Sequence, residues 1–192
     1  MNFLDKQFGR MGNRMFQMAF CYAYARDKGI NYYFQDPKWF ERYGDEIKSL
    51  YRQDGPPLDY VSVHIRRAGN PQNPSEPAYA KNSFYQNLWE SGYYENAIKW
   101  FPEDKLLIFS DDIEWCKKNI TWESTAFHEG NELEDFSAMA RCKHNIIANS
   151  SYSWWAAYVN ENPKKIVIAP KKWFTDPSYE QFIGFPKEWI RI

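Results

Sequence analysis

The stretch YVSVHIRRAGN (residues 60–70) decides how the rest of the chain is interpreted. It begins as a strand, because alternate positions carry β-branched side chains. It then places an imidazole and two guanidinium groups where the strand leaves the core, at His64, Arg66 and Arg67, just before a Gly- and Pro-containing turn. Ligands of open α/β sheets bind beyond the carboxyl ends of the strands, so this strand end is a candidate site.

The segments that follow residue 60 repeat in a regular order. Apolar runs of four to six residues, typical of buried strands, alternate with segments that have helical periodicity. This alternation predicts βα units and an α/β fold with a parallel sheet. The expected strands are 60–65, 106–110, 125–128, 145–149 and 165–169, and the expected helices lie near 83–100, 112–118, 132–142 and 151–161.

The N-terminal segment is shorter and less regular. It suggests a strand at 3–8, a turn at 9–12, a helix N-capped by Asn13 that stops at Gly29, a strand at 32–34 and an ambiguous stretch at 37–50. Gly55-Pro56-Pro57 is the clearest linker signal. We therefore expect a reduced half at 1–54, a second half at 58–170, and a C-terminal segment, 171–192, that packs back on it.

Composition excludes several classes of function. The 192 residues carry a formal charge of −1, so no basic field points to nucleic acid. Three distant cysteines, Cys21, Cys116 and Cys142, form neither a disulfide framework nor a zinc motif, which favours a reducing cytoplasm. No apolar run reaches the roughly 18–20 residues of a membrane span. A signal peptide is not visible.

The two arginines admit two interpretations. The fork of an arginine matches phosphate geometry, and a pair at one strand end favours an anionic ligand. The structural alternative is an ion pair between an arginine and a nearby Asp or Glu.

Two further strand ends carry polar groups. Asp111 and Asp112 follow the strand at 106–110 and suggest metal binding, acid–base chemistry or hydrogen bonds to a nucleobase or ribose, with helix capping as the alternative. Hydroxyl groups open the helix after 145–149, where free N–H groups attract anions and where plain capping is again the alternative. These hydroxyls belong to Ser150, Ser151 and Ser153.

Together the three strand ends predict an anion site beside a carboxylate pair, as a nucleotide diphosphate requires. The Gly9-x-x-Gly12 turn lacks the ending of a triphosphate-binding loop, and no GxSxG elbow is present.

The chain resembles the α-1,2-fucosyltransferases of glycosyltransferase family eleven. The likeness is carried by GRMGNRMFQMAFCYAYARDKG, VSVHIRRAGN, IFSDDIEWCKKN, HNIIANSSYSWWAAYVNENPKKIVIAPKKWF and FPKEWIRI, which occur in the family's order over most of the chain. The resemblance implies a GT-B architecture of two Rossmann-type halves, here with a reduced N-terminal half. It also implies inverting transfer of L-fucose from GDP-fucose to a glycan hydroxyl, α-1,2 to galactose, without metal or cofactor.

The resemblance also implies roles for individual residues. Arg67 would bind the GDP diphosphate with support from Arg66, and His64 and Asp112 would lie near the guanosine. Asp111 joins the substrate-binding set. Phosphate or ribose would be held by Ser150, Ser151 and Ser153, and the acceptor side of the cleft would be lined by Gly12 and Asn13.

Two departures from the family pattern favour an alternative. Gly69 stands where the family motif has Asp, and the segment between the opening helix and HIRR (residues 64–67) is shorter than family members usually have. A degenerate relative that binds a sugar nucleotide or glycan without efficient transfer is therefore the second hypothesis. No general base is assigned, and Glu76, Glu90 and His128 are the residues considered. A cytoplasmic enzyme is expected, with membrane association in glycan assembly and a homo-oligomer both left open.

Overall fold

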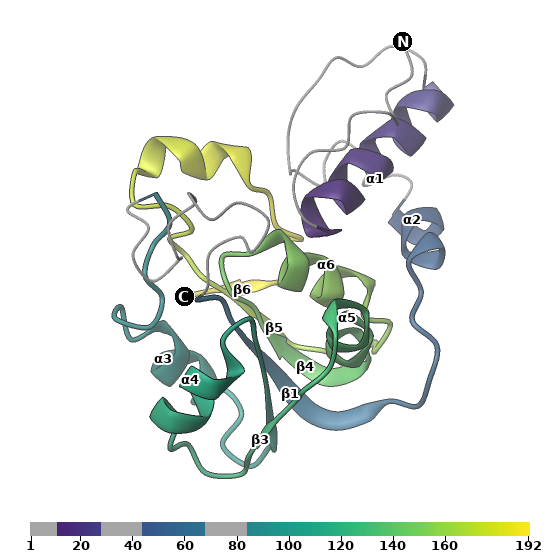
Figure 1. The fold of residues 1–192 in the computed structure, drawn as a ribbon. Coiled ribbons are helices and arrows are strands. Elements are labelled where there is room, and N and C mark those ends of the chain that lie inside the picture. The colour runs from purple at the N-terminus through teal and green to yellow at the C-terminus, as the bar shows by residue number, and fades with distance from the viewer. Residues whose placement is uncertain (1–10, 28–43, 68–83) are drawn as a thin grey trace.

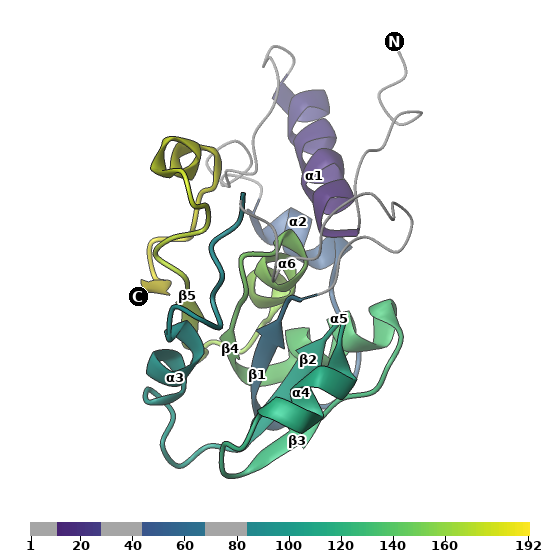
Figure 2. The ribbon, with the colours of Figure 1, turned by 60° about the vertical axis from the view of Figure 1, so that its left-hand side comes forward.

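A six-stranded, wholly parallel sheet organises the computed structural model, which describes residues 11–27, 44–67 and 84–192 (Figures 1 and 2). The strand order β3-β2-β1-β4-β5-β6 is that of a doubly wound, Rossmann-like sheet. The predicted α/β fold is confirmed. The strands are β1 (Leu58–Ile65), β2 (Leu106–Ser110), β3 (Thr125–Phe127), β4 (Cys142–Ile146), β5 (Val167–Ala169) and β6 (Ile190–Arg191).

Helices cover both faces of the sheet (Figure 2). The β-branched side chains of β1 point toward α3 and α4, whereas Leu107 and Phe109 of β2 pack in a second core with α1, α2, α5 and α6. The helices are α1 (Met11–Asp27), α2 (Gly44–Leu50), α3 (Tyr93–Ile98), α4 (Ile113–Asn119), α5 (Glu132–Arg141), α6 (Ser151–Val159) and the 3₁₀ helix η5 (Pro177–Phe182).

Several predicted boundaries were wrong for local reasons. The expected helix at 83–100 shrinks to α3, because Gly92 has a φ of 73° and interrupts helical geometry. The strand expected at 145–149 starts at Cys142, since α5 passes into β4 without an intervening turn and Cys142 pairs with Leu58.

The first described helix also differs from its prediction. It begins at Met11, so residues 11 and 12 are helical and Asn13 is not the N-cap. The strands expected at 3–8 and 32–34 lie outside the described residues. The division into two GT-B halves at residues 55–57 stays a prediction.

The first turn of α1 lies against the first turn of α6. Phe16 packs on the two buried indoles Trp154 and Trp155, with ring centroids 4.7 and 4.8 Å away. A methyl group at Gly12 would lie 2.5 Å from the backbone of both Ser151 and Tyr152. Gly12 therefore allows the two helices to approach.

Gly12→Ala is expected to destabilise the fold by about 1–3 kcal/mol, because backbone atoms block the new methyl group and α1 must shift. Urea unfolding measures the change. Met18→Ala, on the exposed side of the same helix, is the matched control and should stay within about 0.5 kcal/mol of wild type. Equal stability of Gly12→Ala and wild type would contradict the close approach.

Candidate functional site

The carboxyl ends of three central strands meet at one edge of the sheet. β1 lies between β2 and β4, with Ile65 paired to Ser110 and Val63 paired to Ile146. The order of strands reverses between β1 and β4, and such switch points are where ligands of doubly wound sheets bind. The three polar strand ends predicted from sequence are therefore neighbours.

Arg66 is held by a carboxylate. Its guanidinium forms an ion pair with Asp111, and its side chain is only 7% exposed. The other oxygen of Asp111 accepts a hydrogen bond from the Arg67 backbone N–H at 2.9 Å. The ion-pair interpretation thus holds for Arg66, and Asp111 fixes the two residues that directly follow β1.

Arg67 is held differently. Its guanidinium carbon lies 3.3 Å from the centroid of the Trp115 ring. Its Nε is buried without a hydrogen-bond partner, and no carboxylate among the described residues forms an ion pair with it. The side chain lines a narrow pocket at the β1–β4 switch point, together with Ile65, Arg66, Gln86, Asn87, Leu88, Trp89, Tyr94 and Asn149.

His64 is buried beneath the first turn of α6. Its ring centroid lies 5.6 Å from that of Tyr152, and its Nδ1 has no hydrogen-bond partner. Burial, with a further contribution from the Arg66 charge, lowers the pKa of His64 to about 3. The imidazole is therefore neutral at physiological pH.

The buried His64 makes stability sensitive to acid. Because its pKa is about 3 in the folded state and 6.5 in the unfolded chain, the unfolded state binds the proton first as pH falls below 6.5. We therefore expect the free energy of unfolding of wild type to fall by about 2 kcal/mol, relative to that of His64→Gln, when the pH is lowered from 7.5 to 5. Urea unfolding at both pH values measures this shift, and a pH-independent difference would contradict it.

Asp112 caps α4, as the capping alternative proposed. Its carboxylate accepts the Trp115 N–H at 3.3 Å, and its own N–H donates to Ser110 Oγ at 3.0 Å. The adjacent carboxylates therefore do not act as a pair, since Asp111 contacts the arginines while Asp112 orders a helix.

The serine turn at the start of α6 has mainly structural bonds. Ser153 Oγ accepts the Ala148 N–H at 3.2 Å and donates to the Ser150 carbonyl at 3.3 Å. Ser151 Oγ donates to Asn13 Oδ1 at 2.7 Å, which ties α1 to this edge of the sheet. The side chain of Ser150 makes no capping bond.

Part of the lining of the pocket was missed by the sequence interpretation. Gln86, Asn87 and Trp89 line it from the segment that was expected to be helical. The buried amide of Asn149 holds this segment, because it donates to the carbonyls of Gln86 at 2.8 Å and Trp173 at 3.0 Å. Asn149 is the last residue of the strand predicted at 145–149, and that position was its only signal.

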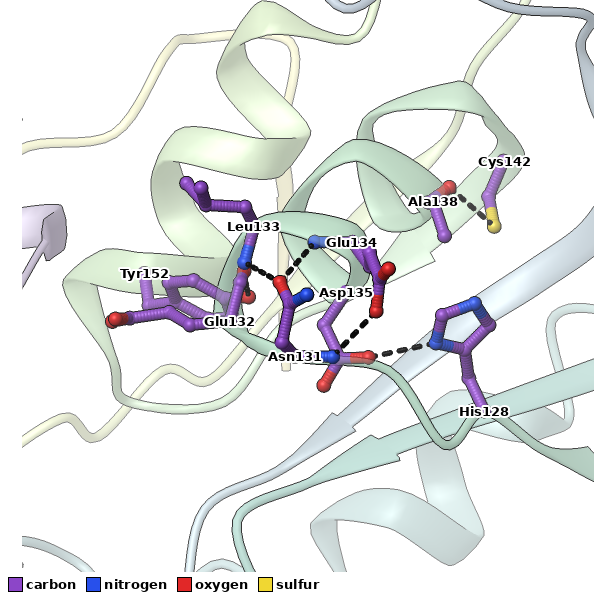
Figure 3. A network of polar contacts seen from close by, with 9 residues as sticks. All are labelled: His128, Asn131, Glu132, Leu133, Glu134, Asp135, Ala138, Cys142 and Tyr152. Atoms are coloured by element: carbon purple, nitrogen blue, oxygen red, sulfur yellow. Dashed lines mark hydrogen bonds and ion pairs between the residues drawn. The ribbon is translucent and has the colours of Figure 1, made fainter.

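Of the residues considered as a general base, His128 belongs to a polar network (Figure 3). Its Nδ1 lies 2.7 Å from Asp135 Oδ1, and burial raises the pKa of that carboxyl despite the opposing effect of the histidine. Asn131 forms a capping box with Glu134 at the start of the same helix, α5. Glu90 is exposed, and Glu76 and Gly69 lie outside the described residues.

Comparison with known proteins decides the family. The model of glycosyl transferase family 11 matches residues 46–192, more than half of the chain. The chain belongs to glycosyl transferase family 11. This family 11 chain matches no solved structure, and no helix in its described part is long and apolar enough to cross a membrane.

Curated relatives of this family 11 chain are named as glycosyl-, colitosyl- and fucosyltransferases. The O-antigen biosynthesis glycosyltransferase WbnK of Escherichia coli is 36% identical over 59% of the chain and 39% of the relative. An alpha-1,2-colitosyltransferase of Escherichia coli is 31% identical over 83% of the chain and 61% of the relative. Human galactoside alpha-(1,2)-fucosyltransferase 1 is 28% identical over 57% of the chain and 31% of the relative. The chain thus spans less than two thirds of each of these relatives.

Proposed function

We propose that this family 11 glycosyltransferase moves L-fucose from GDP-fucose to a sugar hydroxyl, the 2-position of galactose on a glycan, with inversion. The observation that carries the proposal is Arg67, a cation without a carboxylate partner among the described residues, which lines a pocket at the switch point of the sheet. The names of the relatives support transfer to a 2-position.

The chemistry needs a cation at this place. When the bond between fucose and GDP breaks, negative charge develops on the diphosphate and the sugar acquires oxocarbenium character. The guanidinium of Arg67 would bind the departing phosphate oxygens, because its planar fork matches their geometry. Arg66, neutralised by Asp111, would help to hold the chain directly after β1, where Arg67 follows. In this proposal no metal takes part.

The other predicted site residues have proposed roles as well. His64 and Asp112 would lie near the guanosine. The turn formed by Ser150, Ser151 and Ser153 would contact phosphate or ribose. Gly12 and Asn13 would mark the acceptor side, and the hydrogen bond that Ser151 donates to Asn13 supports this placement beside the donor.

A turnover assay tests the proposal. GDP release from GDP-fucose is measured with galactose-terminated oligosaccharides in EDTA, and the product linkage is determined by NMR. Formation of an α-1,2-fucosylated product without added metal is expected. Strict dependence on Mg²⁺ or Mn²⁺ would contradict the metal-free mechanism, and turnover of GDP-colitose alone would reassign the donor.

A second candidate is a relative that binds GDP-sugars without efficient transfer. It is favoured by Gly69 in the place of the family Asp. Donor binding with no transfer across a broad acceptor panel would select it. Robust turnover would eliminate it.

A further inference from the structure

Two consecutive arginines at the end of β1 are fixed by two different kinds of partner. Arg66 lies against a carboxylate, and its charge is neutralised by Asp111. Arg67 lies with its guanidinium 3.3 Å from the centre of the Trp115 ring. An ordinary surface arginine moves among many rotamers, so a partner is needed to hold Arg67 at the pocket.

Trp115 is itself rigidly placed. Its backbone N–H donates to Asp112, so the helix cap sets the position of the residue. Its ring meets the edge of Trp89 with centroids 4.8 Å apart and planes at 85°. Trp89 in turn packs on Trp122 at 5.8 Å. The orientation of the indole is therefore set by its packing, without help from a ligand.

An indole is chemically suited to this task. A carboxylate at the same place would neutralise Arg67 and compete with an incoming phosphate for its N–H groups. The face of a tryptophan attracts a guanidinium by a cation–π interaction and uses none of its N–H donors. The cation stays in place and remains available to an anion.

We propose that Trp115 is a positioning residue, which holds the Arg67 guanidinium against the pocket so that it is ordered for the diphosphate of the donor. This inference rests on the proposed function. Two residues of the segment 111–115 then hold one arginine each: the carboxylate of Asp111 fixes Arg66, and the indole of Trp115 fixes Arg67.

Binding of GDP, measured by calorimetry in EDTA, tests the proposal. Trp115→Met, which keeps apolar volume without a π face, is expected to weaken GDP binding about tenfold. Trp115→Phe, which keeps a π face, should bind GDP nearly as tightly as wild type does. Trp100→Met, at an exposed tryptophan outside this aromatic cluster, is the matched control and should bind as wild type does.

A double-mutant cycle separates positioning from general packing. In the Arg67→Ala background, Trp115→Met should have no further effect on the affinity for GDP, measured at millimolar ligand. A second tenfold loss in that background, or equal effects of Trp115→Met and Trp100→Met on the affinity for GDP, would overturn the proposal.

Failure of the proposed function would give a different result. If wild type does not bind GDP, the donor assignment falls. Urea unfolding of wild type, Arg67→Ala, Trp115→Met and the double mutant then still reports whether Arg67 and Trp115 interact. If the two substitutions change the free energy of unfolding additively, the positioning role is overturned.

Discussion

Arg67→Ala is expected to lower the affinity for GDP and for GDP-fucose about a hundredfold, because each hydrogen bond from a charged donor contributes about 1.5–3 kcal/mol. No carboxylate among the described residues pairs with Arg67, so removing it deletes positive charge from the pocket without freeing a buried anion. Calorimetric titration of both ligands in EDTA measures the loss.

Arg52→Ala is the matched control for this experiment. Its guanidinium pairs with Glu161 on an exposed surface, with the arginine side chain 63% exposed, so its removal changes the net charge equally but leaves the pocket intact. Unchanged affinity in Arg67→Ala would refute the role of the arginine. If neither GDP nor GDP-fucose binds to wild type, the chain belongs to the family by descent but has no working donor site.

Asp111→Asn is expected to destabilise the fold by about 3 kcal/mol, because it removes the carboxylate charge that pairs with the buried guanidinium of Arg66. The asparagine oxygen still accepts the Arg67 N–H, so the substitution isolates the electrostatic contribution. Equilibrium unfolding in urea measures the loss.

Asp104→Asn is the control for this prediction. Asp104 pairs with Lys143, whose side chain is 43% exposed, and such pairs contribute about 0–1 kcal/mol. A loss in Asp111→Asn no larger than in Asp104→Asn would show that Arg66 is effectively solvated.

The sheet was predictable from sequence for a simple physical reason. Buried parallel strands require apolar runs, and Leu106–Ser110 and Val167–Ala169 are such runs between polar helical segments. Parallel strands end at one edge, so the meeting of polar strand ends followed from the same pattern. The segment before Gly92 was not predictable, because its apolar spacing fits a helix and its actual path depends on the distant Asn149.

The partners within the site were only partly predictable. The sequence offers Asp and Glu partners for Arg66 without selecting one, and Asp111 lies 45 residues away along the chain. Capping by Asp112 is a local interaction, which is why it was among the alternatives. The contact between Arg67 and Trp115 is neither local nor charge-matched, so no pattern in the sequence indicated it.

The contact between the first turns of α1 and α6 has a consequence for synthesis of the protein. The Asn13–Ser151 bond joins residues 138 positions apart, and the apolar side chains of α1 that flank it, such as Phe16, are buried against α6. At a translation rate of about 5–20 residues per second, α1 leaves the ribosome on the order of 10 s before its partner exists. During that interval the apolar face of α1 has no partner from α6 and is exposed to water, the kind of surface that chaperones protect.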